Sequence, residues 1–268
     1  MKKTSVGLLK RMLLPKFPAI EIDGAVVFQG CDVSQDQLEE AAVLGAVMRK
    51  KPQKDSGREL HELNLLNQKR YAVTAWFYDF LDYPWERQYR KWRPELLKDV
   101  SGDVLEAGVG TGRNLQYYPH HVNLTAIDLS PAMLKKASRR CSEAACSVTF
   151  VHEDASRMLS IPSAQYDWIV SFFLCCVLPN ELQEQAVSEF ARVLKPGGRF
   201  RLLEMKYSEN PALRKRQERF APFVAKVYGA GFDRDTLSHL EKNKDLTVTG
   251  TRFLKADTYL LIDGIRKG

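Results

Sequence analysis

The stretch Glu106-Ala107-Gly108-Val109-Gly110-Thr111-Gly112 decides how this chain is expected to fold. It ends an apolar run at residues 103–107 that predicts a β-strand, and residues 113–118 behind it favour the start of a helix. Glycines at a strand-to-helix turn let a ligand approach the backbone, because no Cβ stands in the way. The unpaired N–H groups at the start of a helix add hydrogen-bond donors for that ligand.

An acidic residue ends the next predicted strand, at residues 123–127, where Asp128 follows. A carboxylate at the tip of the second strand can hold ribose hydroxyls. The glycine turn and this carboxylate together predict a ligand that contains a nucleoside. A dinucleotide fingerprint would place its third glycine at position 113, but this chain has Arg113 there and its third glycine one place earlier, at Gly112.

Strand patterns alternate with helical patterns from residue 103 to residue 205, which predicts a parallel, doubly wound α/β sheet. Two late strands, at residues 246–253 and 257–263, are expected to be antiparallel neighbours. The other strands are expected at residues 103–107, 123–127, 148–153, 166–171 and 199–205, and helices at residues 85–98, from 131 onward and at 189–198, the last ending in a turn.

The form E-x-G-x-G-T-G, followed by Asp128 after the second strand and Asp154 after the third, resembles motif I and the later landmarks of the class I S-adenosylmethionine-dependent methyltransferases. The resemblance covers residues 71–267. It implies a seven-stranded sheet of order 3-2-1-4-5-7-6 with strand 7 antiparallel. It also implies an enzyme that uses S-adenosylmethionine to transfer a methyl group.

The same resemblance implies roles for the first landmarks. Gly108, Gly110 and Gly112 form the cofactor turn, with backbone atoms of the first two facing the methionine part. Glu106 is expected to order this turn through hydrogen bonds, and Asp128 to accept hydrogen bonds from both ribose hydroxyls. Considered without the glycine turn, an acidic residue between a strand and a helix is more often the N-cap of that helix than a ligand-binding residue.

The adenine side of the cofactor is implied in the same way. Leu129 or Met133 is expected to flank the ring, Asp154 to accept from its amino group, and the N–H of Ala155 to reach a ring nitrogen. Tyr78 resembles an aromatic residue in the segment that closes over the cofactor, and a purely structural role is an equal alternative for it.

No catalytic residue is assigned. Methyl transfer from a sulfonium needs the acceptor and the methyl group held in line, and a general base only if the acceptor is protonated. The five cysteines form no C-x-x-C pair and have no histidine partners at zinc spacing, so no metal site is predicted and a reducing compartment is favoured. Three of the five histidines, His120, His121 and His152, are candidate acids or bases, but surface or loop positions without a catalytic role are favoured for them.

The acceptor is expected beside Phe173, Leu174 and Cys175, which follow the fourth strand. No Asn/Asp-Pro-Pro-aromatic tetrapeptide stands there, which argues against amino groups of nucleobases or of protein glutamine. The motif context resembles the branch with phospholipid, quinone and thiol methyltransferases, and this favours a small lipophilic or membrane-associated acceptor. A soluble small molecule is the first alternative, and a non-enzymatic cofactor-binding scaffold or assembly partner is the second.

A net charge of +7 favours an anionic partner, and no nucleic-acid-binding signature is present. Basic clusters lie at residues 1–16 and 214–219, the second within a predicted lid at 206–231. An anionic membrane surface fits both clusters, so a cytoplasmic protein with peripheral membrane attachment is predicted. The oligomeric state is not indicated by the sequence.

The methyltransferase motifs leave the first part of the chain unexplained. Residues 1–65 are predicted to form an N-terminal extension with a basic amphipathic start, and residues 66–268 the methyltransferase domain. Within the extension, residues 19–32 favour a short extended segment or a hairpin, with Asp23-Gly24 as the hairpin signal. A helix is expected at residues 34–49 and a linker at 50–58.

Overall fold

The computed structural model describes residues 19–22, 25–29 and 83–268. The chain divides into two compact units, Met1–Lys69 and Arg70–Gly268. Several predictions lie outside the described residues: the domain boundary at 65/66, the basic start at 1–16, the helix at 34–49, the linker at 50–58, and Tyr78.

In the first unit, the described residues form a two-stranded antiparallel hairpin. Strand β1 (Ala19–Ile22) pairs with β2 (Ala25–Gln29), with Ile22 opposite Ala25 at the closed end. Apolar residues flank an Asp-Gly pair here, a pattern typical of tight hairpins, and the hairpin expected in this segment is confirmed.

The second unit is built on a seven-stranded sheet of order β5-β4-β3-β6-β7-β9-β8. Neighbouring strands from β5 to β7 are parallel, whereas β9 is antiparallel to both β7 and β8. Counted within the sheet this is the predicted order 3-2-1-4-5-7-6, which is thereby confirmed. The strands are β3 (Gly102–Ala107), β4 (Val122–Asp128), β5 (Ser147–His152), β6 (Tyr166–Phe172), β7 (Leu194–Met205), β8 (Leu246–Phe253) and β9 (Tyr259–Arg266).

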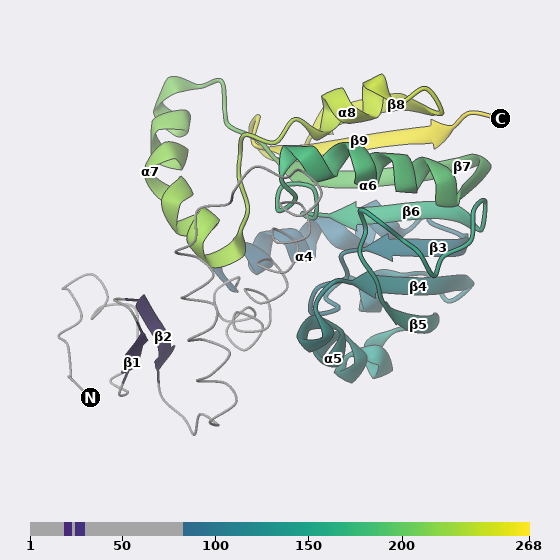
Figure 1. The fold of residues 1–268 in the computed structure, drawn as a ribbon, viewed down its shortest axis with the longest axis horizontal. Helices are drawn as coiled ribbons and strands as arrows, with labels where there is room; N and C mark the ends of the chain where they lie inside the picture. The colour runs from purple at the N-terminus through teal and green to yellow at the C-terminus, as the bar shows by residue number, and fades with distance from the viewer. Residues whose placement is uncertain (1–18, 23–24, 30–82) are drawn as a thin grey trace. The chain divides into compact units, whose positions relative to one another are not determined.

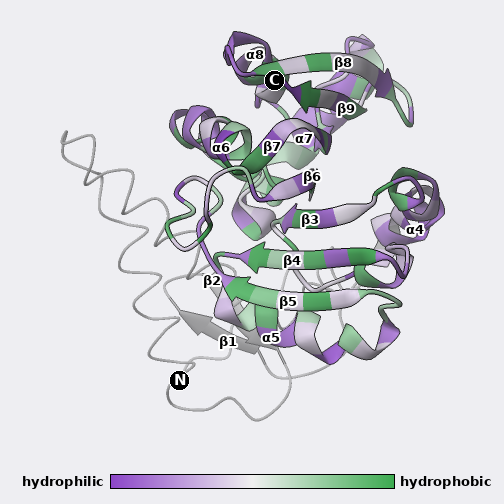
Figure 2. Cartoon of the chain, turned by 90° about the vertical axis from the view of Figure 1, so that its right-hand side faces the viewer, coloured by the Kyte–Doolittle hydropathy of each residue, from purple (hydrophilic) through white to green (hydrophobic). Residues whose placement is uncertain are grey.

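Helices cover both faces of this sheet. Helix α4 (Tyr83–Leu97) lies on one face and α6 (Asn180–Val193) on the opposite face, as both views show (Figures 1 and 2). The central strand β3 is therefore buried on both sides, and Val104, Leu105 and Ala107 have no exposed surface. The remaining helices are α5 (Pro131–Arg139), α7 (Pro211–Tyr228) and α8 (Thr236–Lys242).

The helix predicted at residues 113–118 is wrong. The structure has a single 3-10 turn there, Leu115–Tyr117, and Tyr118 is already extended with φ −71° and ψ 136°. Pro119 explains the break, because the residue before a proline is pushed out of the helical region. The glycine turn is thus not followed by a long helix.

The predicted turn after α6 also differs. The helix ends at Val193 and β7 begins at once with Leu194, so residues 194–198 belong to the strand. Helix α7 occupies most of the predicted lid segment and lies beyond the carboxyl ends of β3 and β6 (Figure 1). None of the described helices is long and apolar enough to cross a lipid bilayer.

Candidate functional site

The glycine turn stands at the carboxyl end of β3, and its three glycines have left-handed backbones with φ of 77°, 55° and 79°. A Cβ on Gly108 would come within 3.1 Å of Leu174 Cδ1, and one on Gly112 within 2.9 Å of Ala137 Cα. A Cβ on Gly110 would meet no atom within 4 Å. A Cβ would therefore clash with the backbone of α5 at Gly112 and crowd the Leu174 side chain at Gly108, whereas the space over Gly110 is open.

Helix α5 supports the turn from the other side. The guanidinium of Arg140, just after α5, donates to the carbonyl oxygen of Thr111 at 2.9 Å and to its hydroxyl at 3.0 Å. The helix itself begins with Ser130, whose hydroxyl accepts from the N–H of Met133, and Pro131 occupies its first position. The Ser-Pro pair after Asp128 therefore starts α5 directly beside the site.

Asp128 ends β4 with both carboxylate oxygens fixed by backbone donors. The N–H of Gly110 donates to Oδ2 and the N–H of Ser130 to Oδ1, each at 2.9 Å. Burial raises the Asp128 pKa to about 6, although these two hydrogen bonds oppose the shift. Each oxygen of an ionised carboxylate has a second lone pair, so the side chain can still accept two hydrogen bonds from a ligand.

Glu106 lies beneath the turn in a buried polar network that reaches α4. Its Oε1 accepts from Asn114 Nδ2 at 2.7 Å, and Asn114 Oδ1 accepts from Arg93 Nε at 2.6 Å. Arg93 and Arg113 both pair with Glu86 of α4, at 2.5 and 2.9 Å. Burial raises the Glu106 pKa to about 7, despite the hydrogen bond from Asn114. The network joins the glycine turn to α4.

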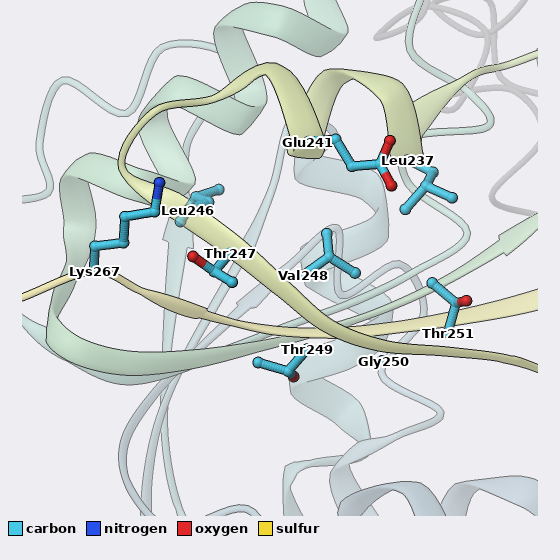
Figure 3. Close-up of a pocket in the computed structure, with 9 residues that line it drawn as sticks. All are labelled: Leu237, Glu241, Leu246, Thr247, Val248, Thr249, Gly250, Thr251 and Lys267. Carbon is cyan, nitrogen blue, oxygen red and sulfur yellow. The ribbon is translucent and has the colours of Figure 1, made fainter.

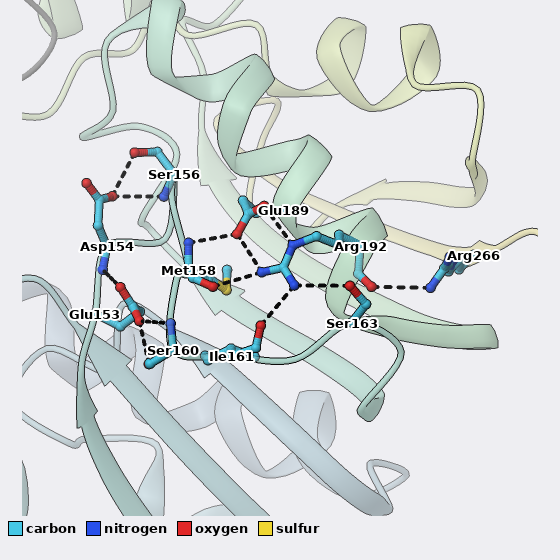
Figure 4. Close-up of polar contacts among 10 residues, drawn as sticks. All are labelled: Glu153, Asp154, Ser156, Met158, Ser160, Ile161, Ser163, Glu189, Arg192 and Arg266. Atoms are coloured by element: carbon cyan, nitrogen blue, oxygen red, sulfur yellow. Dashed lines mark hydrogen bonds and ion pairs between the residues drawn. The ribbon is translucent and has the colours of Figure 1, made fainter.

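Asp154 begins the loop after β5. Its Oδ1 accepts from the backbone N–H and the hydroxyl of Ser156, at 2.8 and 2.7 Å (Figure 4). Ala155 beside it is buried, and Leu129 lies half-buried with its carbonyl oxygen 2.9 Å from His152 Nε2. The predicted adenine-side residues thus follow the adjacent strands β4 and β5 at the same edge of the sheet.

Two residues of α6 that the sequence analysis did not single out fix this loop (Figure 4). Arg192 donates to the carbonyl oxygens of Met158 and Ile161, both at 2.8 Å. Glu189 accepts from the N–H of Met158 at 2.7 Å and pairs with Arg192. In the sequence, their spacing of three residues predicts only that the two side chains pair on one face of a helix. It does not predict a contact with a loop about 30 residues away.

The expected acceptor side begins at Phe173, directly after β6. Phe173 has φ of +63° although it is not glycine, and its N–H donates to the carbonyl oxygen of Leu203 at 2.7 Å. Its ring packs 4.8 Å from that of Tyr89 and 6.2 Å from that of Tyr259, measured between centroids. An aromatic cluster from α4, β9 and the end of β6 therefore surrounds this position.

The neighbouring cysteines are structural. Cys175 and Cys176 are buried, and burial followed by the charge of Glu204 raises both thiol pKa values well above their ordinary value. Such thiols stay protonated and are poor nucleophiles.

The candidate histidines lie on the surface. His120 and His121 are exposed just before β4, at the end opposite to the glycine turn, and His152 is exposed beside Leu129.

An open groove of about 460 Å³ lies elsewhere, between α8 and the edge strand β8 (Figure 3). Glu241, Thr247 and Lys267 are among its lining residues. Strands β6, β7 and β9 separate β8 from β3, so this groove is distinct from the site at the glycine turn.

In the described part of the chain, no group of three or more acidic, histidine or cysteine side chains is arranged to hold a metal ion.

Residues 104–198, which include the glycine turn, Asp128 and Asp154, match the family model described as a methyltransferase domain. A phosphatidylethanolamine N-methyltransferase from Cereibacter sphaeroides is 36% identical over 131 residues, which are 48% of this chain and 62% of that protein. Residues 104–198 form a methyltransferase domain similar to those of the class I S-adenosylmethionine-dependent methyltransferases. S-adenosylmethionine is the cofactor of this family.

Two further similarities bear on this domain. An S-adenosylmethionine-dependent Diels-Alderase, iccD of Talaromyces variabilis, is 28% identical over 174 residues, 63% of this chain and 59% of that protein. The crystal structure of the N-methyltransferase NodS from Bradyrhizobium japonicum superposes with a TM-score of 0.51 at 19% identity, over 70% of this chain and 99% of NodS, and shows the common fold. The chain spans 62% and 59% of the length of the two curated relatives.

Proposed function

We propose that this protein transfers the methyl group of S-adenosylmethionine to a small lipophilic acceptor at a membrane surface, with the amine of a phospholipid as the leading candidate. The observation that carries the methyl-transfer part is the glycine turn, with open space over Gly110 and the fixed carboxylate of Asp128 beside it. The similarity to a phosphatidylethanolamine N-methyltransferase supports the acceptor.

The residues present fit the cofactor. Gly110 leaves room for its methionine part, and Asp128 presents lone pairs to the ribose hydroxyls. Asp154, oriented by Ser156, lies at the adenine end, with Leu129 and Ala155 beside it. Bound there, the cofactor supplies a methyl group that its positive sulfur has already activated.

The protein itself contributes the positioning of the acceptor relative to the methyl group. Phe173 and the rings packed on it shape an apolar surface for the acceptor, and the nearest loop is fixed through Leu203 and Glu204. Holding acceptor and methyl carbon in line at contact distance supplies much of the rate acceleration. We assign no general base. A phospholipid amine is an ammonium ion at neutral pH, as the lysine side chain is, so it must first lose a proton to water before its nitrogen lone pair can attack the methyl carbon.

Helix α7 supports a membrane-borne acceptor. Phe220 and Phe223 are 37% and 43% exposed, with ring centroids 5.0 Å apart. Arg216 and Arg219 are exposed on the same helix, and within the described ranges neither forms an ion pair. Aromatic rings beside free cations favour an anionic lipid surface. A cytoplasmic protein that attaches peripherally to the membrane follows from this proposal.

The relationship to a Diels-Alderase favours one alternative, a protein that binds the cofactor but catalyses a different reaction. A soluble small-molecule acceptor is the other.

Purified full-length protein should be incubated with methyl-labelled S-adenosylmethionine and vesicles containing phosphatidylethanolamine, alone or with a lipid-free cell extract. The proposal expects label in the lipid phase, and Asp128→Ala should remove it. Label confined to aqueous products would establish the soluble acceptor, and cofactor binding without any transfer would favour the non-methylating alternative.

A further inference from the structure

Glu204 is an acidic side chain inside an apolar strand. It is the penultimate residue of β7, it is 3% exposed, and Leu202 and Leu203 before it are equally buried. Within the described part of the chain it has no basic partner in an ion pair. A buried carboxylate costs free energy unless hydrogen bonds replace its lost water. The position therefore needs an explanation beyond packing.

Its hydrogen bonds connect β7 to a turn far away in the sequence. Oε1 accepts from the N–H of Cys175 at 2.9 Å, and Oε2 accepts from the N–H of Cys176 at 2.8 Å. These two amides begin a single helical turn, in which the N–H groups of Val177 and Leu178 return to the carbonyl oxygen of Leu174. The first amides of such a turn have no partner within it, so Glu204 caps the turn from another strand.

The capped turn carries residues that face both halves of the site. Phe173, immediately before it, has the left-handed backbone and the acceptor-side ring contacts. Leu174 lies against the first glycine of the cofactor turn, since a Cβ on Gly108 would come within 3.1 Å of it. A left-handed non-glycine residue persists only where its surroundings fix it, and here the carbonyl oxygen of Leu203 and the carboxylate of Glu204 both act on this segment.

We propose that Glu204 is a positioning residue that holds the turn Leu174–Leu178 and thereby sets Phe173 and Leu174 against the acceptor and the cofactor. The role of this turn in placing an acceptor rests on the proposed function. The hydrogen-bonded cap itself does not depend on that function.

The chemistry of the cap makes the turn sensitive to acid. Burial raises the Glu204 pKa to about 7, against the two backbone hydrogen bonds and those from the cysteine thiols. The charged or titratable groups around it are the thiols of Cys175 and Cys176, which stay protonated, and Arg234, whose charge acts on Cys176. Below about pH 7 the carboxyl gains a proton on one oxygen, and that oxygen becomes a weaker acceptor for its amide.

Amide hydrogen exchange of the full-length protein tests the cap without any turnover. Glu204→Gln preserves volume but turns an amide NH2 toward one of the two N–H groups, so one hydrogen bond is lost. We expect exchange in the peptide covering residues 173–178 to accelerate about tenfold, the scale of one hydrogen bond to a charged group. Glu184→Gln, exposed on α6, is the matched control and should leave that peptide unchanged.

Wild-type protein provides a second readout if Glu204→Gln fails to fold. After correction for the intrinsic pH dependence of exchange, protection of residues 173–178 should fall as pH drops from 8 to 6. Equal protection in wild type and Glu204→Gln, or protection independent of pH in wild type, would overturn the proposal. With phosphatidylethanolamine vesicles, the variant should raise the acceptor KM more than it weakens binding of S-adenosylhomocysteine. No turnover by wild type would reject the proposed function while leaving the exchange result to decide the cap.

Discussion

The N–H of Gly110 donates a 2.9 Å hydrogen bond to Oδ2 of Asp128, and this contact links the glycine turn to the end of the neighbouring strand. The N–H groups of Gly108 and Val109 add two more bonds to β4, both to the carbonyl oxygen of Ile127. The turn and the carboxylate are therefore held together before a ligand arrives. Preorganisation of this kind lowers the entropy that binding would otherwise cost.

Asp128→Ala should weaken binding of S-adenosylhomocysteine by at least about tenfold. The change removes the carboxylate that we propose accepts from the ribose hydroxyls, and it releases the amides of Gly110 and Ser130. Each hydrogen bond to a charged group contributes about 1.5–3 kcal/mol. Calorimetric titration measures the effect. Asp245→Asn, exposed before β8, is the control and should bind as wild type does. Unchanged affinity in Asp128→Ala would refute the assignment of this carboxylate to the ribose.

The same affinity should depend on pH. Burial raises the Asp128 pKa to about 6, and in the proposed binding mode the ionised form accepts both ribose hydrogen bonds. Binding should therefore weaken as pH falls through about 6, approaching a tenfold loss per unit below it. The free energy of unfolding depends on pH in the opposite direction. The Asp128 pKa is about 6 in the folded protein and 3.8 as the ordinary value, so the protonated carboxyl favours the folded state. This contribution to stability is fully present below pH 3.8 and is lost as pH rises through about 6. Titrations between pH 5 and 8 should show the slope in wild type, and Asp128→Asn should flatten it.

Three of the six described glycines with positive φ, Gly110, Gly112 and Gly197, should respond differently to alanine. Gly112→Ala combines backbone strain with a clash against Ala137 and should destabilise folding by about 2–4 kcal/mol. Gly110→Ala and Gly197→Ala meet no atom within 4 Å, so each should cost only the strain of about 1–2 kcal/mol.

Cofactor affinity separates the last two. Gly110→Ala should weaken binding of S-adenosylhomocysteine at least about tenfold, because its methyl group enters the ligand's space. Gly197→Ala, with the same strain at the start of β7, should bind normally. Denaturant unfolding and calorimetry on the matched set decide both points. Equal affinity in the two variants would mean that the open space over Gly110 is not used.

The sheet could be predicted from the sequence because its signals are local. The strands from β3 to β6 are rich in apolar and β-branched residues, and the Gly-rich turn, Asp128 and Asp154 follow the ends of β3, β4 and β5. The order of strands came from the family resemblance, since periodicity alone does not reveal which strands are neighbours. The helix predicted at 113–118 failed because Pro119 outweighs the helical pattern before it, and the helix predicted at 189–198 fails beyond Val193, where β7 begins.

The supporting contacts of the site could not be predicted. Glu204 reaches the amides of Cys175 and Cys176 across 28–29 residues of chain, and Arg192 reaches the carbonyl oxygen of Met158 across 34. Nothing in the spacing of such residues reports a hydrogen bond to a distant backbone. Glu204 was visible only as an acid within an apolar strand, a local conflict that often marks a functional position.

The double variant Cys175→Ser, Cys176→Ser should retain methyl transfer. Both thiols are buried and have raised pKa values, so neither supplies a thiolate, and direct displacement needs no enzyme nucleophile. The added hydroxyls should cost stability, on the order of 1–3 kcal/mol, unless they bond to Glu204. Iodoacetamide should label the half-exposed Cys141 and Cys146 of the native protein before either buried cysteine. Loss of all turnover with cofactor affinity intact would contradict this prediction.

Charge reversal on α7 tests the membrane surface. Arg216→Glu, Arg219→Glu should reduce co-sedimentation of the full-length protein with anionic vesicles, because each cation near a charged leaflet contributes about 1 kcal/mol. Reversal replaces attraction by repulsion, so a loss of more than tenfold in partitioning is expected at low salt, and the wild-type interaction should itself weaken as salt is added. Lys242→Glu, Lys244→Glu, an equal charge change on and just after α8, is the control and should sediment as wild type does.

Phe220→Ser, Phe223→Ser separates the apolar contribution from the electrostatic one. These exposed rings lie on the same helix, so their removal should weaken binding to anionic vesicles while leaving its salt dependence in place. If neither α7 variant differs from its control, the helix is not the membrane contact. A soluble acceptor would then be favoured, whereas the match of residues 104–198 to the methyltransferase domain would be unaffected.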